Sequence, residues 1–296
     1  MSTAVAETRA GSHTLRWGER TYVMGIINVT RDSFSGDGLL AGGRGPDEAV
    51  AAAVDLARRF VDEGADILDV GAESTRPRAV YGEHPEVGAA TEARAAVPVV
   101  AALARELGEH VPISIDTSKG EVARQALAAG ASIVNDVWAA RRDPRTAEAA
   151  AETGAALVLM HNKERAEYPG GMMAEITAWL RDAVDGALAA GVQRGQLIVD
   201  PGIGFGKDSA MNLELLHRLG ELRALGLPIL VGPSRKRFIG ELLDDAPPGD
   251  RLEGTAAAVS LAISAGADMV RVHDVRKMAR VVRVADAITR LTPSFG

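Results

Sequence analysis

The sequence contains no cysteine, and this absence removes several classes of protein from consideration. Disulfide-stabilised folds, thiolate nucleophiles and zinc sites with cysteine ligands all require that residue. No stretch approaches roughly 18 uninterrupted apolar residues, which excludes a membrane-spanning helix. Residues 1–20 also lack the apolar segment of a secretory signal. We therefore expect a cytoplasmic location, since a cysteine-free chain fits a reducing compartment.

Aromatic residues and positive charge are also scarce. Only 4% of the 296 residues are aromatic, whereas 47% are hydrophobic, and Ala, Val, Leu and Gly dominate. This composition suits helices packed on buried parallel strands. The 40 acidic residues outnumber the 33 basic ones and give a formal net charge of -7. An acidic surface argues against general binding to nucleic acids or anionic membranes.

Short apolar segments alternate with longer segments of helical periodicity along the chain. Eight apolar segments have the length of buried strands, namely 22–29, 65–70, 111–116, 132–136, 155–161, 197–200, 228–232 and 268–273. Apolar residues recur at every third and fourth position in the helical segments 47–63, 121–129, 172–190, 212–224, 255–265 and 276–291. Several helices end at a Gly-Ala pair, where the glycine supplies a left-handed cap.

Eight such units of similar size predict an α/β fold of the (βα)₈ TIM-barrel type. No change of composition marks a boundary, so we expect a single domain over residues 21–296. Residues 1–20 are expected to form a short, mobile N-terminal extension. A doubly wound open sheet is the alternative, but the even size of the units favours the barrel.

Polar residues stand at the carboxyl ends of the predicted strands, which is where a barrel places its functional groups. At one strand such a residue could simply mark the edge of the buried region. All eight strand ends carry polar or charged groups, which indicates a shared binding mouth. Asp69 and Glu73 are expected to brace the barrel internally rather than to act in catalysis.

The polar residues of this mouth fall into two chemical groups. The first offers acceptors and an amide for the N–H edge of a planar nitrogen heterocycle: Asp116, Asn135 and Asp200. The second offers donors for phosphate or pyrophosphate: Asn28, Arg76, Arg271 and His273. Lys236 suits either group.

A glycine-rich stretch, PGIGFGKD, follows the sixth predicted strand. A phosphate-binding P-loop spaces its glycines differently and ends in Ser or Thr, whereas Asp208 follows Lys207 here. The stretch does not match the dinucleotide-binding GxGxxG pattern either. Glycines would let the backbone approach a flat ligand, flanked by Phe205. A tight turn between strand and helix is the alternative explanation.

Several stretches together resemble one family, the dihydropteroate synthases. They are MGIINVTRDSFS, DVGAESTRP, ISIDTSKGEVARQALAAGASIVND, LVLMH, LIVDPGIGFGKDSAMNLELL, GPSRKRFIG, RLEGTAAA and GADMVRVHDV. They occur in the family's order from about residue 22 to 285 and cover nearly the whole chain. The specificity lies in the ordered set rather than in any one stretch.

The resemblance implies a TIM-barrel transferase of folate biosynthesis. Such an enzyme joins p-aminobenzoate to 6-hydroxymethyl-7,8-dihydropterin pyrophosphate, forms 7,8-dihydropteroate and releases pyrophosphate, with Mg²⁺ bound to that group. The resemblance further implies a homodimer and a target of sulfonamides. Two loops, residues 30–40 and 73–83, would close over the substrates.

Matching positions carry the family's residue roles onto this sequence. The pterin would be held by Asp116, Asn135, Asp200 and Lys236, in a pocket lined by Met160. The pyrophosphate would be held by Asn28, Arg76, Arg271 and His273, with Asn28 nearest Mg²⁺. The aminobenzoate would be bordered by Thr75, Pro77, Phe205 and Arg237. Charge stabilisation would fall mainly to Asp116, Lys236, Arg271 and His273.

Two departures from the family pattern bear on this interpretation. Arg31 stands where the family usually has proline, and Trp138 stands where it prefers a small residue. They put loop closure, the fit of the pterin and sulfonamide sensitivity in question. Two other functions stay open: a catalytically silent paralogue that binds pterins, and a methyltransferase that moves a methyl group from methyltetrahydrofolate to a corrinoid.

Overall fold

A computed structural model describes residues 4–30, 38–39, 45–73 and 87–291 of the chain. Its centre is a sheet of eight parallel strands in the order β8-β7-β6-β5-β4-β3-β10-β9. The strands are β3 (Tyr22–Asn28), β4 (Ile67–Gly71), β5 (Ile113–Asp116), β6 (Ile133–Asp136), β7 (Ala156–Met160), β8 (Leu197–Asp200), β9 (Leu230–Val231) and β10 (Met269–Val272). A bridge between Val199 and Ile229 joins the two ends of the sheet. The predicted TIM barrel is confirmed, and the open sheet is wrong.

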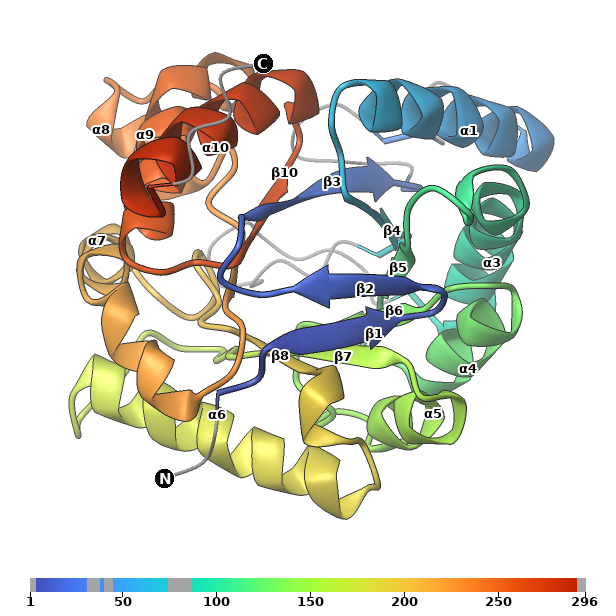
Figure 1. The fold of residues 1–296 in the computed structure, drawn as a ribbon, viewed down its shortest axis with the longest axis horizontal. Helices are drawn as coiled ribbons and strands as arrows, with labels where there is room; N and C mark the ends of the chain where they lie inside the picture. The colour runs from blue at the N-terminus through green and yellow to red at the C-terminus, as the bar shows by residue number, and fades with distance from the viewer. Residues whose placement is uncertain (1–3, 31–37, 40–44, 74–86, 292–296) are drawn as a thin grey trace.

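Helices surround this barrel (Figure 1). They are α1 (Pro46–Asp62), α3 (Ala89–Leu107), α4 (Gly120–Ala128), α5 (Arg145–Thr153), α6 (Met172–Ala189), α7 (Ser209–His217), α8 (Arg237–Leu242), α9 (Leu252–Ser264) and α10 (Val275–Thr289). Short 3₁₀ turns lie at η2 (Arg194–Gln196), η3 (Leu219–Leu225) and η4 (Pro248–Asp250). None of the helices in the described parts of the chain is long and apolar enough to cross a membrane.

Six of these helices occur where the hydrophobic periodicity predicts them, whereas α3, α5 and α8 do not follow from it. Both α3 and α5 are rich in alanine, which marks a buried face less clearly than a large apolar residue does. Pro98 inside α3 further weakens the helical signal, because proline removes a backbone donor. Helix α8 has only six residues, which is too short to show a period.

An antiparallel hairpin of β1 (Glu7–Ala10) and β2 (His13–Arg16) precedes the barrel. It lies across the end of the barrel that faces the viewer in Figure 1. The side-chain amide of Gln196 bonds both the N–H and the C=O of Arg9, at 3.1 and 2.8 Å, and the His13 ring bonds the Gly108 carbonyl at 2.9 Å. The expectation of a mobile tail over residues 1–20 misses this hairpin, because alternation over only four residues is a weak signal of a strand.

Side chains inside the barrel form two zones. At the end under the hairpin, Ala10 and Leu15 pack with the inward apolar residues of the barrel strands: Tyr22, Met24, Ile67, Ile133, Ala156, Val158, Ile198, Leu230 and Met269. The outward residues of the same strands pack in the separate, larger core beneath the helices. The hairpin thus closes the amino-terminal end of the barrel and leaves the carboxyl ends of the strands for the site.

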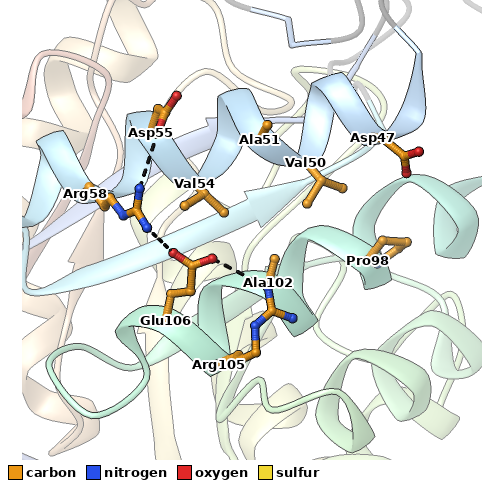
Figure 2. Close-up of a pocket in the computed structure, with 10 residues that line it drawn as sticks. All are labelled: Asp47, Val50, Ala51, Val54, Asp55, Arg58, Pro98, Ala102, Arg105 and Glu106. Atoms are coloured by element: carbon orange, nitrogen blue, oxygen red, sulfur yellow. Dashed lines mark hydrogen bonds and ion pairs between the residues drawn. The ribbon is translucent and has the colours of Figure 1, made fainter.

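The outer wall carries a groove of about 480 Å³ between α1 and α3 (Figure 2). In it Arg58 forms ion pairs with Asp55 and Glu106, and Arg105 approaches Glu106 at 3.5 Å. These charges neutralise one another at the surface, where such pairs contribute little to stability. The groove lies on the helical wall, away from the strand ends where a barrel places its chemistry.

Candidate active site

Strand alternation brings the predicted site residues to the inner face of the barrel. Successive side chains on a strand point to opposite faces, so residues two positions apart share a face. Five of the predicted strand-end residues lie an even number of positions beyond an inward apolar residue: Asn28 after Met24, Asn135 after Ile133, Met160 after Val158, Asp200 after Ile198 and Arg271 after Met269. The site is therefore the layer directly above the apolar zone.

Arg271 links the acidic groups of this layer. Its Nε donates to Asp69 Oδ2 at 2.6 Å, and one terminal nitrogen donates to Asp116 Oδ2 at 2.8 Å. Asn135 Nδ2 also donates to Asp69 Oδ2, at 3.1 Å. Asp69 has no exposed surface, so it serves as the internal brace that its position suggests. The structure thus places the acidic and basic residues of the mouth in direct contact.

Two buried oxygens of this cluster lack a protein partner among the described residues. They are Asp69 Oδ1 and Asp116 Oδ1. A buried acceptor without a donor costs free energy until a ligand or water supplies one. Burial also raises the pKa of Asp116 to about 7, although the Arg271 guanidinium opposes this shift. An N–H group on a bound ligand would satisfy Asp116 and favour its ionised form.

Asp200 ends β8 on the neighbouring side of the mouth. Its Oδ1 accepts a hydrogen bond from Gly202 N at 2.7 Å. Burial raises the pKa of Asp200 to about 6, and this backbone bond and the nearby Lys236 ammonium limit the rise. Lys236 Nζ lies 4.2 Å from the centre of the Phe205 ring, a cation–π contact. Asp200, Phe205 and Lys236 therefore form one edge of the site.

His273 and its neighbours form the next part of the rim. Its Nδ1 lies 2.9 Å from Ser234 Oγ, and its own backbone N–H donates to the same oxygen at 3.2 Å. Arg235 has a left-handed backbone with φ of 58° and makes two 3.0 Å bonds to the Asp274 carboxylate. Arg235 thus braces the loop that carries Ser234 and Lys236.

The remaining predicted residues divide into those that the structure places and those outside its described part. Met160 is buried at the end of β7 and Asn28 is half-buried at the end of β3. Arg237 begins α8, where it pairs with Glu241 at 3.3 Å and leaves 44% of its side chain exposed. The residues outside the described ranges are Arg31, Thr75, Arg76 and Pro77, together with most of both predicted closing loops.

Trp138 follows β6, and its ring lies under the Arg142 guanidinium at 3.8 Å. Its backbone N–H donates to Asp136 Oδ1 at 2.8 Å. Asp136 is fully buried and also accepts a 2.7 Å bond from Thr146. The carboxylate therefore fixes the turn that carries the tryptophan, and Asp136 has a structural role beside Asn135.

Two lysines, the half-buried Lys119 and the buried Lys207, are part of this end of the barrel, although neither is among the predicted site residues. Lys119 bridges Glu73 and Glu92 at 2.5 and 2.6 Å, so Glu73 braces the strand ends against the outer helix α3 rather than the inside of the barrel. Lys207 is only 4% exposed and contacts His161. Their signal in the sequence is a lysine directly after a strand end or inside a glycine-rich turn. A lysine is usually a surface residue, so this signal is weak without the fold.

A resident metal site is not evident in the described part of the chain, where no three His, Asp or Glu side chains form a metal-binding group. Asn28 offers one hard oxygen at the strand end. Mg²⁺ usually keeps several waters and takes few protein ligands when it binds with a phosphate group. The residues therefore fit a Mg²⁺ that arrives on a pyrophosphate and do not fit a metal held by protein ligands alone.

A closed parallel barrel with a polar cluster at its carboxyl end defines a TIM-barrel enzyme. The sequence pattern of the pterin binding enzyme family matches residues 24–273. The dihydropteroate synthase of Synechocystis is 44% identical over 286 residues, which cover 95% of this chain and 94% of that protein.

Solved structures agree with these matches. A Clostridium difficile dihydropteroate synthase solved in the presence of pteroic acid has a TM-score of 0.85 and 43% identity, and covers 93% of this chain and 98% of its own. The Xanthomonas albilineans enzyme with 4-aminobenzoic acid has a TM-score of 0.84 and 39% identity, over 97% and 98% of the two chains. The chain belongs to the pterin-binding enzyme family and, within it, to the dihydropteroate synthases, which are transferases of folate synthesis.

Proposed function

We propose that the mouth of this barrel condenses 6-hydroxymethyl-7,8-dihydropterin pyrophosphate with p-aminobenzoate to give 7,8-dihydropteroate and pyrophosphate. The observation that carries the assignment of the site is the Arg271 bridge to Asp69 and Asp116, at 2.6 and 2.8 Å. It supports a single site in which groups suited to a nitrogen heterocycle adjoin groups suited to an anion. We assign the activity to one pterin-binding domain over residues 21–296.

The pterin is proposed to occupy the acidic part of the mouth. Asp116, whose Oδ1 has no protein partner among the described residues, would accept from the ring N–H groups. Asn135 and Asp200 would bind the rest of that edge, Lys236 would donate to a ring acceptor, and Met160 would line the pocket. All these residues except Lys236 are buried, so the contacts form in an environment that strengthens hydrogen bonds.

The chemistry needs charge stabilisation more than proton transfer. The bond between the pterin CH₂ carbon and the pyrophosphate oxygen breaks, and its electron pair leaves with pyrophosphate. The aminobenzoate nitrogen then forms the new C–N bond and releases its proton to water. Asp116 and Asp200 would stabilise the electron-poor pterin, while Arg271, His273, Asn28 and Arg76 would bind the departing anion. Thr75, Pro77, Phe205 and Arg237 would border the aminobenzoate and aim its nitrogen.

Mg²⁺ is proposed to enter the site on the pyrophosphate. Once bound there, it would neutralise part of the charge that develops on the leaving group. Asn28 is the residue suited to approach it, through its side-chain oxygen. The cysteine-free chain fits a reducing cytoplasm, where we place the reaction.

The protein is further proposed to act as a homodimer through α9 and α10. These two helices pack side by side and expose Leu261, Val284 and Ile288, which are 65%, 60% and 70% accessible. A largely apolar groove of about 620 Å³ lies between them. Contiguous exposed apolar surface of this kind is typical of a protein interface.

A steady-state assay with both substrates and Mg²⁺ tests the proposal. Pyrophosphate release that depends on both substrates, without added corrinoid, would support the synthase and exclude the methyltransferase and the silent paralogue. Asp116→Asn keeps the shape of the side chain but removes its charge, so kcat/KM should fall by about 100-fold. Unchanged turnover in this variant would mean that Asp116 does not hold the pterin.

A further inference from the structure

Lys207 is a buried cation for which the reaction has no assigned use. Its side chain lies in the turn after β8 with 4% of its surface exposed. Its Nζ is 3.0 Å from His161 Nδ1, 3.0 Å from the Gly202 carbonyl oxygen and 2.9 Å from the Phe205 carbonyl oxygen. An ammonium group has three N–H bonds, and each has an acceptor here.

This arrangement explains how the protein tolerates a buried ammonium. Burial, with Lys236 and Lys163 nearby, lowers the pKa of Lys207 to about 7, and the Asp200 carboxylate opposes the shift. Burial and the adjacent Lys207 also lower the pKa of His161 to about 2. His161 is therefore a neutral ring whose Nδ1 accepts from Lys207. An apolar side chain such as methionine would fill similar space at lower cost, whereas only the lysine can donate hydrogen bonds to the three acceptors.

The three acceptors define what Lys207 holds. Gly202 and Phe205 are the two ends of one turn, so a single ammonium ties its carbonyls together. His161 belongs to the neighbouring strand end, against which the turn packs. A Cβ at Gly202 would collide with the His161 carbonyl, and one at Gly206 would collide with the Lys163 carbonyl. The turn can sit this close only with glycine at these positive-φ positions.

Both ends of the clamped turn bear on the proposed site. Gly202 N donates to Asp200 Oδ1 at 2.7 Å, and the Phe205 ring lies 4.2 Å from Lys236 Nζ. Asn212 supports the middle of the turn by accepting from Gly204 N at 2.7 Å. Lys207 itself touches neither Asp200 nor Lys236 through a hydrogen bond among the contacts that the structure describes.

We propose that Lys207 is a positioning residue, whose side-chain nitrogen clamps the Gly202–Phe205 turn and thereby holds the Phe205 ring in place for the aminobenzoate. This inference rests on the proposed function, because it assigns Phe205 to the aminobenzoate. The glycine-rich stretch is then neither a phosphate loop nor a plain turn. It is a turn whose conformation is fixed by hydrogen bonds from Lys207 to its carbonyl oxygens.

The first test measures the clamp without reference to activity. Lys207→Met retains the length of the side chain and removes all three donors. Hydrogen exchange of the peptide spanning residues 201–207 should become about tenfold faster, because the amides of Gly202, Gly204 and Phe205 lose their fixed acceptors. The matched control is Lys163→Met. It removes a lysine side chain from the adjoining segment, but the Lys163 ammonium donates to Glu175 at 3.0 Å and to the Glu167 carbonyl rather than to the turn.

The second test separates positioning from mere stability. In Lys207→Met the KM for p-aminobenzoate should rise by about tenfold, while the KM for the pterin pyrophosphate changes by less than about threefold. A purely structural role would lower the active fraction, and so kcat, without this split. If the methionine variant does not fold, Lys207→Gln keeps part of the donor set and should give intermediate values of both readouts.

Unchanged exchange in the 201–207 peptide, or an unchanged KM for p-aminobenzoate, would overturn the proposal. The same effects in Lys163→Met would also overturn it, since they would reflect loss of charge alone. Absence of turnover in the wild-type protein would instead contradict the proposed function. The exchange measurement would still decide whether Lys207 clamps the turn.

Discussion

Burial disfavours the ionised form of two carboxylates in the mouth of the barrel. Asp116 and Asp200 are 8% and 5% exposed, and burial raises their pKa values to about 7 and about 6. A carboxylate that must be ionised to bind an N–H edge is then partly protonated in mildly acidic solution. The two carboxylates proposed to bind the pterin thus change charge near neutral pH.

The first prediction concerns activity. If both carboxylates act as anions, kcat/KM should fall as the pH drops below about 7, and the fall should steepen below about 6 as the second group takes up a proton. In Asp200→Asn only one protonation remains, so the acidic limb should have a slope near one. A wild-type profile that stays flat between pH 8 and pH 5 would contradict this account.

The second prediction concerns stability at the same residue. The pKa of Asp200 is higher in the folded state, about 6, than its ordinary value of 3.8, so the folded protein keeps a proton that the unfolded chain releases. Its contribution to the free energy of unfolding should therefore decline as the pH rises from about 4 to 6, by about 3 kcal/mol at most. Denaturant unfolding of wild type and Asp200→Asn should show a difference that grows over this range and then levels off. A difference in unfolding free energy that does not change between pH 4 and 6 would contradict a raised pKa for Asp200.

At this scale the sequence predicts the site residues but not their contacts. Alternation along eight strands is enough to place Asn135, Asp200 and Arg271 on one inner layer. The sequence analysis assigns Arg271 to the anion and Asp116 to the heterocycle, whereas the structure joins them in one ion pair. The two residues are 155 positions apart, and no local signal in the sequence indicates that pairing, since it depends on barrel closure.

Among the strands, those of the N-terminal hairpin are the ones that periodicity does not predict. The barrel strands are predictable because each is a continuous apolar run between helical segments. The hairpin strands alternate over only four residues, and their partners lie far away in the sequence, at Gly108, Ser132 and Gly195. Its function follows from position: it covers the apolar zone that the barrel would otherwise expose to water.

A prediction follows for the hairpin. Leu15 is 3% exposed and belongs to the apolar cluster inside the barrel. Leu15→Ala should lower the free energy of unfolding by about 2–4 kcal/mol through lost burial and a residual cavity. Both KM values should stay within about twofold, because the site lies at the opposite end of the strands. Arg16→Ala, at the exposed neighbouring position, is the control, with an expected change below about 0.5 kcal/mol. A raised KM in Leu15→Ala would show that the two ends of the barrel are coupled.

For the whole molecule, the distribution of apolar surface is uneven. Helix α10 presents Val284 and Ile288 on the side away from the barrel, and α9 adds Leu261. Exposure of these three aliphatic side chains to water carries an unfavourable free energy in an isolated chain. A second copy related by a two-fold axis would cover the face with the same face, which forms a closed dimer.

The last prediction tests that dimer. Leu261→Glu together with Ile288→Glu should convert the protein to a monomer. Each substitution occurs in both subunits of a symmetric dimer, so each buries two carboxylates in an apolar interface. Light scattering coupled to gel filtration would show the mass fall from about twice 30.9 kDa to the chain mass itself. Leu188→Glu on α6, where the leucine is 37% exposed, introduces the same change elsewhere and should leave the mass unaltered. A wild-type protein that is already monomeric would refute the dimer. A variant that stays dimeric would assign the contact to another face, and retained turnover in a true monomer would show that each barrel is complete by itself.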